Sequence, residues 1–335
     1  MVETDTTVYY DEDADLSPLE GRTVAIVGYG NQGRAQALNM RESGVDDVIV
    51  GNREDASWEQ AETDGFPVYT TAEAAERADV VFFLVPDEIQ PRVYEEAIAP
   101  NLSAGDVVNF ASGYNITYDF IDPADDVDVV MVAPRMIGTT VRELYEAGRG
   151  APAFVAVHQD ASGEAHDVAL AIAKGIGATR SGAIEGDFET ETITDLMTEQ
   201  ALIPVFFHAL MAKFEIEREA GVPPEAILME QYLSREMSFI FEKAATQGFV
   251  EQLDLHSQTS QYGQLEGVDS FDGSPIREFM RETYEEIDNG KFATEWTNEQ
   301  AAGYPALKRL YKKYREIDMI EVEQKTLDEL DLREE

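Results

Sequence analysis

The chain has 335 residues, 44% of them apolar, so it is long enough for about two domains with hydrophobic cores. Sixty-seven acidic residues against 25 basic ones give a formal net charge of −42, which leaves no basic stripe and excludes nucleic acid as a partner. The chain has no cysteine, which excludes disulfides, thiolate metal sites and thiol nucleophiles.

The first segment, Met1–Asp15, is acidic and lacks the basic and apolar regions of a signal peptide. No apolar run in the chain approaches the roughly 18 residues of a membrane span, so we expect no membrane partner. The acids are spread along the whole chain, and such a surface stays hydrated when salt shortens the Debye length to about 3 Å at 1 M. These features predict a cytoplasmic protein from a high-salt cell.

From residue 22 to about residue 183, short apolar runs alternate with stretches of helical pattern. Most of the runs show no polar alternation, which is typical of parallel strands buried on both faces. The expected strands are Thr23–Val27, Val48–Val50, Val80–Val85, Val107–Phe110, Val127–Val132 and Ala153–Val157. The expected helices between them include Gln32–Glu42, Thr71–Arg77 and Ala161–Ile176. This βαβ rhythm predicts an α/β domain with a doubly wound parallel sheet.

After about Ile184 the strand pattern stops and long helices take over. The expected helices are Thr192–Glu219, Pro224–Gln247, Ser274–Asn289 and Tyr304–Arg315, and Pro204 should kink or break the first of them. The sequence therefore predicts an α/β domain at 1–183, an all-α domain at 184–327 and an acidic tail at 328–335.

A glycine-rich motif joins the first strand to the first helix. Gly28 suits a tight turn, Gly30 lets the backbone approach a pyrophosphate, and Gly33 permits close packing of helix on strand. The phosphates would then lie at the positive N-terminal end of the helix. The motif predicts a Rossmann-type domain for a nicotinamide dinucleotide, although the glycines could serve only a turn. The expected cofactor contacts are Gly28, Tyr29, Gly30, Asn31, Gln32 and Gly33.

The loop after the second strand bears on the choice between NADP and NAD. Arg53 and Ser57 would suit the 2′-phosphate of NADP, whereas Glu54 and Asp55 would repel a phosphate that they faced. The pattern favours NADP and leaves NAD open. Arg53 could also be an ordinary solvated cation.

Several motifs together resemble the ketol-acid reductoisomerases, the second common enzyme of branched-chain amino-acid biosynthesis. The likeness runs from about residue 8 to residue 325 with the motifs in order. They are GYGNQG at 28–33, VPDEIQP at 85–91, FASGYNI at 110–116, MVAPR at 131–135, VHQD at 157–160, TITDLMTEQ at 192–200, SQTSQYG at 257–263 and NGKFATEW at 289–296.

The resemblance implies the short form of the family. This form has a Rossmann domain and a knotted helical domain, which pairs into a homodimer (or higher oligomer) with an active site shared between subunits. It also implies two Mg²⁺ ions that bridge a small-molecule substrate, and a reaction in which an alkyl migration precedes hydride transfer to a 2-keto acid. Further cofactor contacts are implied at Pro86, Asp87, Gln90 and Gly113.

The metal site can be approached from the residues alone. Asp195 and Glu199 are four apart, so both carboxylates project from one face of a helix, and Mg²⁺ prefers oxygen ligands. An acid pair at this spacing can equally be a solvated helix face. The resemblance adds Glu236 as a metal ligand and substrate contact, and Ser257 as a contact to the substrate carboxylate. Their structural alternatives are a helix-surface acid and a capping hydroxyl.

Three residues depart from the family's pattern. Ser112 stands where the family has His, Arg135 where it has Lys, and Tyr232 where it has a second metal-binding Glu. Arginine keeps a cation but cannot lose its proton, and tyrosine is a poor ligand for a hard cation. The changes fall on site positions, and the alkyl migration depends most on metal polarisation of the substrate.

These departures lead to our main hypothesis. It is an NAD(P)H-dependent reductase of this family that acts on a 2-keto acid or a related carbonyl or imine, with the isomerase step altered or lost. Its catalytic residues would be Arg135, Asp195, Glu199 and Ser112, and its substrate contacts Tyr232, Glu236 and Ser257. One alternative is an authentic ketol-acid reductoisomerase. Another is a non-catalytic regulatory protein that only binds the cofactor.

Overall fold

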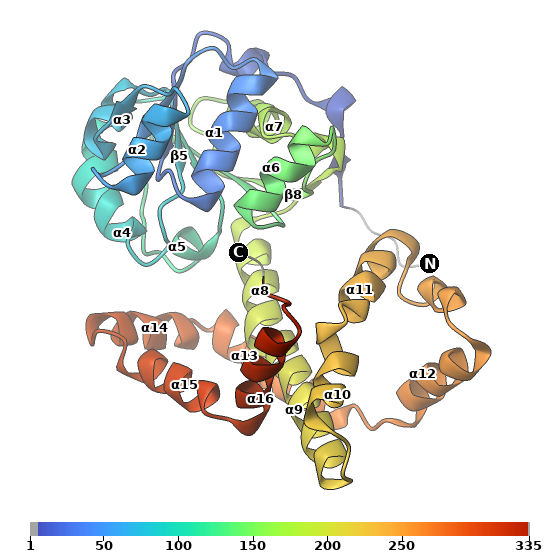
Figure 1. Ribbon diagram of the computed structural model, residues 1–335. Coiled ribbons are helices and arrows are strands. Elements are labelled where there is room, and N and C mark those ends of the chain that lie inside the picture. Colours follow the sequence, from blue (N-terminus) through green and yellow to red (C-terminus); the bar gives the residue numbers. More distant parts are fainter. Residues whose placement is uncertain (1–5, 334–335) are drawn as a thin grey trace. The chain divides into compact units, whose positions relative to one another are not determined.

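The computed structural model describes residues 6–333, and the chain divides into two compact units, Met1–Asp195 and Leu196–Glu335 (Figure 1). The division falls inside a helical run that extends from residue 188 to residue 219, later than the boundary predicted at residue 183. The first unit is α/β and the second is helical, as the two halves of the sequence predict.

Six parallel strands form the centre of the first unit in the order β4-β3-β2-β5-β6-β7, the order of a Rossmann sheet. The strands β2, β3, β5, β6 and β7 are buried along their whole length, as expected from their unbroken apolar sequence. Their bounds are β2 Val24–Val27, β3 Val48–Gly51, β4 Val68–Tyr69, β5 Val80–Phe83, β6 Val107–Phe110 and β7 Asp128–Pro134.

Three more strands extend the predicted parallel sheet beyond β7, and they make it a mixed sheet. β8 (Ala153–Gln159) runs antiparallel to β7, β9 (Ala183–Glu185) runs parallel to β8, and β1 (Val8–Tyr9) runs antiparallel to β9. Between β7 and β8 the chain forms α6 (Gly138–Glu146), which packs beside α1 (Asn31–Ser43). The chain then returns along β7, so β8 is antiparallel to it. β1, β4 and β9 are too short to produce a readable sequence pattern.

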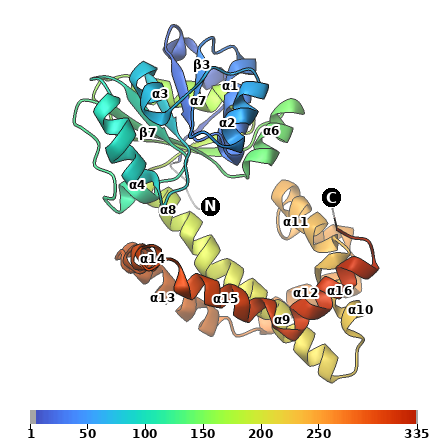
Figure 2. The same cartoon turned by 60° about the vertical axis from the view of Figure 1, so that its left-hand side comes forward.

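Helices cover both faces of the sheet and enclose two apolar layers (Figure 2). One layer lies under α1, α2 (Ala56–Thr63) and α7 (Ala165–Gly175), and the other under α3 (Thr71–Arg77), η3 (Tyr94–Ile98) and α5 (Tyr114–Thr117). Adjacent residues of β5 serve opposite layers, Phe82 the first and Phe83 the second, because side chains alternate along a strand.

The second unit consists of helices within its described residues. The helical run that leads into it is α8 (Phe188–Met197), η6 (Thr198–Leu202) and α9 (Ile203–Glu219). η6 is a π-helical turn just before Pro204, whose missing N–H removes a normal helix hydrogen bond and accounts for the interruption predicted there. The other elements are α10 Pro224–Leu228, η7 Met229–Leu233, α11 Glu236–Gln247, η8 Glu251–Leu255, α12 Gln258–Ser270, α13 Ser274–Asp288, α14 Lys291–Ala301, α15 Pro305–Arg315 and α16 Asp318–Glu329.

The predicted acidic tail at 328–335 begins inside a helix. α16 continues to Glu329, and the Arg333 guanidinium then folds back on the Asp328 carboxylate, with Nε 2.5 Å from Oδ1. Residues 334 and 335 of the predicted tail lie outside the described residues. Across the part of the chain that the structure describes, no helix is both long enough and apolar enough to cross a bilayer.

Candidate functional site

The glycines in the turn between β2 and α1 are needed for two different reasons. A Cβ on Gly28 would lie 2.8 Å from the Val85 nitrogen, and one on Gly33 would lie 1.9 Å from the Gly28 oxygen, so packing within the protein requires both. Gly28 also has φ +96°, which favours glycine. A Cβ on Gly30 would meet nothing within 4 Å. Protein packing therefore does not explain Gly30, and the close approach of a ligand would.

A cleft of about 670 Å³ opens in front of this turn. Its walls are the C-terminal ends of β3 and β5 and the loop after β6, where β2 is flanked by β3 and β5 and the order of strands reverses. The predicted cofactor residues on its surface are Gly28, Tyr29, Gly30, Asn31, Gln32, Arg53, Ser57, Pro86, Asp87 and Gln90, and Ser112 joins them. Gly33 and Gly113 are not on its surface.

Two of these residues use their side chains for the scaffold. Tyr29 is 2% exposed, and its hydroxyl donates to Asp64, 2.9 Å away. Burial is the main reason that the pKa of Tyr29 is raised above its ordinary value. The buried Gln90 amide donates to the Val85 oxygen and accepts from Asn115. Tyr29 therefore offers the cleft its backbone, and Gln90 braces the loop after β5.

The loop after β3 places a cation and an acid side by side. Arg53 is 86% exposed, and its Nε lies 2.6 Å from Asp55 Oδ2. The other oxygen of Asp55 accepts from the Ser57 backbone N–H and caps α2. The hydrogen bond from Arg53 is the main cause of the lowered pKa of Asp55. Since Arg53, Asp55 and Ser57 all line the cleft, the arrangement keeps both NADP and NAD open.

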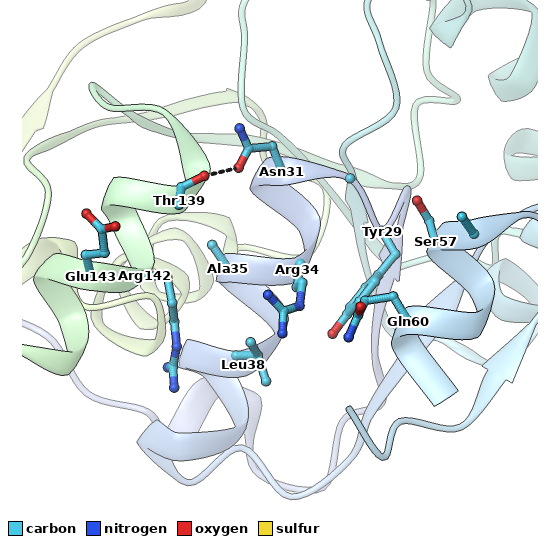
Figure 3. A pocket seen from close by; sticks show the side chains of 12 residues that line it. Tyr29, Asn31, Arg34, Ala35, Leu38, Ser57, Gln60, Thr139, Arg142 and Glu143 are labelled. Atoms are coloured by element: carbon cyan, nitrogen blue, oxygen red, sulfur yellow. Dashed lines mark hydrogen bonds between the residues drawn. The ribbon is translucent and has the colours of Figure 1, made fainter. Parts of the chain in front are cut away.

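A second pocket, of about 440 Å³, lies between α1, α2 and α6 (Figure 3). The start of α6 is fastened to the start of α1, because Thr139 donates to Asn31 at 2.9 Å. Both arginines on its wall are paired with acids, Arg34 with Asp64 and Arg142 with Glu42. The pocket therefore presents no unpaired arginine to a ligand.

Arg135 follows the last residue of β7 and contacts two carboxylates. Its Nη1 lies 2.6 Å from Glu191 Oε1, and its Nη2 donates to Asp195 Oδ1. Burial acts to lower the pKa of Arg135, but the charges of Glu191 and Asp195 outweigh it and raise the pKa. Burial raises the pKa of Glu191 despite the guanidinium beside it. Arg135, Glu191 and Asp195 are called the arginine triad below.

Gly113 explains how α8 brings Glu191 to this place. A Cβ on Gly113 would lie 2.2 Å from the Phe188 oxygen, so only glycine lets α8 pack directly on the turn after Ser112. The Gly113 N–H then donates to Glu191 Oε2 at 2.7 Å. Our sequence reasoning missed Glu191. A signal was present, since Glu191, Asp195 and Glu199 are spaced four apart and extend the predicted acid pair by one residue.

The remaining predicted residues lie in the second unit. Glu199 is in the π-turn η6, and the Tyr232 hydroxyl donates to Glu323. Glu236 is the exposed first residue of α11. Ser257 is the N-cap of α12, and its Oγ accepts from the Ser260 N–H at 3.3 Å. Each of these contacts is one that an ordinary helix or helix pair makes.

The carboxylates of Glu191 and Asp195 do not, as arranged, fit a divalent cation. Asp195 is already paired with Arg135, and both oxygens of Glu191 accept protein hydrogen bonds. Within residues 6–333 no three histidine, aspartate or glutamate side chains come together as a metal site. The assignment of Mg²⁺ to Asp195, Glu199 and Glu236 therefore stays a prediction.

The fold and the cleft define a class of protein, an NAD(P)-dependent oxidoreductase with a Rossmann domain followed by a helical domain. Comparison with known families gives the narrower answer. Residues 18–182 match the model of the acetohydroxy acid isomeroreductase NADPH-binding domain, and residues 188–331 match that of the ketol-acid reductoisomerase C-terminal domain. The chain belongs to the ketol-acid reductoisomerase family, as the sequence motifs predict.

Individual relatives agree over nearly the full length. The chain is 47% identical over 320 residues to the ketol-acid reductoisomerase (NADP(+)) of Methanopyrus kandleri, which covers 94% of this chain and 95% of the relative. It is 48% identical over 319 residues to that of Haloarcula marismortui, with 94% and 90% covered. The structure of an NADH-preferring ketol-acid reductoisomerase from an uncultured archaeon superposes with a TM-score of 0.89 at 39% identity, with 95% and 98% covered. These relatives favour the authentic enzyme over our main hypothesis.

Proposed function

We propose that the protein is an NADPH-dependent ketol-acid reductoisomerase of branched-chain amino-acid biosynthesis, with 2-acetolactate as a substrate. The observation that carries the proposal is the match of both units, over more than nine-tenths of the chain, to relatives of that name. The fold supports it, because the cleft lies where a Rossmann domain binds a dinucleotide.

The first unit would bind the cofactor along the cleft. The backbone N–H groups of Asn31 and Gln32 at the start of α1 would meet the pyrophosphate, which the open space at Gly30 admits. Arg53 and Ser57 would meet a 2′-phosphate at the β3 end of the cleft. The nicotinamide then belongs at the opposite end, near Ser112. NADPH, when bound, supplies the hydride.

Arg135 is suited to one part of the chemistry. Hydride transfer to a 2-keto acid turns a carbonyl oxygen into an alkoxide, and a fixed cation stabilises that charge best when it is already in place. Arg135 is held by Glu191 and lies next to the turn that follows Ser112. It would orient and stabilise the oxygen, but a guanidinium does not release the proton that the alkoxide needs.

We also propose that a second copy of the chain covers the helical unit. Exposed apolar side chains are dense there, which is unusual for a surface that stays in water. They include Phe239, Phe241, Phe249, Val250, Tyr262, Leu265, Val268 and Phe271. A homodimer would bury them, and its site could then draw Glu236 and Ser257 from the second copy. The −42 charge and the Haloarcula relative support a high-salt cytoplasm as its setting.

The second candidate is a reductase that lacks the migration step. One observation favours it, because Arg135 occupies Asp195, a carboxylate predicted to bind the metal of that step. The two candidates differ in their substrates. An authentic enzyme oxidises NADPH with 2-acetolactate, whereas a reductase alone acts only on a compound that is already a 2-keto acid or a related carbonyl or imine, such as the rearranged 3-hydroxy-3-methyl-2-oxobutanoate.

The experiment is to follow NADPH oxidation by the purified protein with each compound, in molar KCl with Mg²⁺ added. Turnover of both compounds supports the proposed function. Turnover of the rearranged compound alone supports the second candidate. If neither NADPH nor NADH binds, both candidates are wrong, and a protein without cofactor-dependent activity remains.

A further inference from the structure

In the arginine triad a half-buried cation is fixed by a buried carboxylate and also holds a second, more exposed one. Glu191 is 2% exposed and Asp195 41% exposed at the side chain. The Arg135 guanidinium connects the two with separate nitrogens. The buried end is thus structural, and the exposed end is open to solutes.

We propose that Arg135 is a built-in cation for Asp195, which a divalent metal ion must displace, in whole or in part, to bind that carboxylate. The inference deepens the proposed function, on which it rests for the assignment of Asp195 to the active site. It concerns metal affinity, and it holds whether or not the migration step survives.

Arg135 is held in place by more than its charge. Its backbone N–H donates to the Pro152 oxygen at 2.8 Å, and its guanidinium lies 5.6 Å from the centre of the Phe154 ring. Glu191 is itself fixed by the Gly113 N–H. These contacts hold the guanidinium in place. To release Asp195, Arg135 must therefore move against them, unlike an unconstrained arginine on the surface.

The charge balance gives the direction of the effect. With Arg135 present, the two carboxylates and the guanidinium sum to −1, whereas without it they sum to −2. Opposite charges at hydrogen-bonding distance attract each other even at the effective dielectric of a protein surface, so Arg135 offsets part of the attraction of Asp195 for another cation. Removal of the guanidinium should therefore make Asp195 a better ligand for a divalent cation, even though the protein as a whole is already strongly acidic.

Lysine should have an intermediate effect. A guanidinium presents several N–H groups in a rigid fork and bonds two carboxylates at once, whereas an ammonium is a compact charge on a flexible stem. Arg135→Lys keeps the positive charge but weakens the simultaneous hold on Glu191 and Asp195. The comparison of Arg135→Lys with Arg135→Gln therefore separates geometry from charge.

The test is Mn²⁺ binding measured by electron paramagnetic resonance, in about 1 M KCl so that loose binding to exposed acids is screened to about 3 Å. We expect Arg135→Gln to lower the Kd for Mn²⁺ at one site by about tenfold, or about 1.4 kcal/mol, and Arg135→Lys to lower it less. The matched control is Arg142→Gln. Arg142 also joins two acids, Glu42 and Glu146, but lies on α6, and its loss should leave that site unchanged.

A second substitution assigns the gain to the carboxylate. Asp195→Asn in the Arg135→Gln background should abolish it. The proposal is overturned if Arg135→Gln leaves the Mn²⁺ affinity unchanged, if Arg142→Gln raises it equally, or if the gain survives Asp195→Asn. NADPH titration and thermal unfolding report on the fold of each variant, and Arg135→Lys carries the test if Arg135→Gln does not fold. If the unsubstituted protein binds no nicotinamide cofactor, the proposed function itself is wrong.

Discussion

The two units of this chain bury apolar side chains in different ways. In the first unit the central strands are fully buried, and two apolar layers are closed by its own helices. In the second unit a small cluster around Phe214, Ile227, Leu228 and Met319 is buried, while many large apolar side chains face outward. The first unit therefore buries its apolar side chains with its own elements. The exposed apolar side chains of the second unit are of the kind that a partner would bury.

The largest effect should come from a glycine that the first unit needs for its own packing. Gly33→Ala puts a Cβ 1.9 Å from the Gly28 oxygen, so α1 must move away from the turn. We expect a loss of about 1–3 kcal/mol in the free energy of unfolding and no measurable NADPH binding. Thermal unfolding and fluorescence titration measure the two effects.

Gly267→Ala is the matched control in the second unit, because it lies inside α12 with open space around it. Alanine favours a helix by about 1 kcal/mol relative to glycine, so this variant should be no less stable than the unsubstituted protein. Equal damage from both substitutions would contradict the assignment of Gly33 to tight packing.

The second effect tests whether a partner completes the helical unit. Val268 is 74% exposed on α12. Val268→Asp should shift the protein from dimer toward monomer in light scattering coupled to size exclusion, because an interface loses apolar area and gains a buried charge. Glu266→Gln on the same helix is the control and should leave the mass unchanged. A monomeric unsubstituted protein, or a dimer that tolerates Val268→Asp, would contradict the proposed dimer surface.

Much of the first unit could be predicted because its signals are local. An apolar run, a glycine motif and a helix start are each contained in a few consecutive residues, and the strands from β2 to β8, apart from the short β4, follow them closely. β1 and β9 contain two and three residues, and the partner of β1 is β9, which lies far away in the sequence. No short pattern can announce that kind of strand.

The site was harder to predict because contacts made by folding decide its roles. Glu191 becomes important only when α8 packs on Gly113, and Gly113 itself serves that packing and does not line the cleft. Tyr29 stands in the cofactor motif, yet its ring is buried toward Asp64. A motif indicates where a backbone turn lies more reliably than it indicates where each side chain points.

Gly30 should differ from Gly28 and Gly33, because ligand binding requires it and packing within the protein does not. Gly30→Ala adds a Cβ into space that is open in the protein, so the free energy of unfolding should change by less than about 0.5 kcal/mol. The same Cβ would obstruct a pyrophosphate, so the Kd for NADPH should rise about tenfold, a loss of about 1.4 kcal/mol. Unchanged NADPH affinity would contradict a pyrophosphate at this turn.

The stability of the first unit should depend on pH through Asp64. The pKa of Asp64 lies below its ordinary value of 3.8, chiefly because of the hydrogen bond from Arg34. A carboxyl whose pKa is lowered by folding stabilises the protein above pH 3.8, and this stabilisation is lost as the pH falls through the lowered pKa. Asp64→Asn should lower the melting temperature at pH 7 by a few degrees, since hydrogen bonds to a charged group contribute about 1.5–3 kcal/mol.

The difference between Asp64→Asn and the unsubstituted protein should narrow as the pH falls below 3.8. Glu62→Gln, an exposed acid on α2, is the control and should change the melting temperature little at any pH. If the difference in melting temperature stays constant down to the acid transition, the ionised Asp64 carboxylate is not the source of the stabilisation.

The smallest effect should come from the loop that selects between NADP and NAD. Arg53 is exposed and shares its charge with Asp55, so in molar salt its attraction for a 2′-phosphate is heavily screened. Arg53→Gln should raise the Kd for NADPH about threefold, a loss of about 0.6 kcal/mol that is typical of an exposed ion pair, and leave the Kd for NADH unchanged. Glu54→Gln, with a matched loss of charge in the same loop, should slightly favour NADPH. If Arg53→Gln weakens both cofactors equally, Arg53 contacts the shared part of the dinucleotide, and the preference must come from Ser57 and the α2 N-terminus.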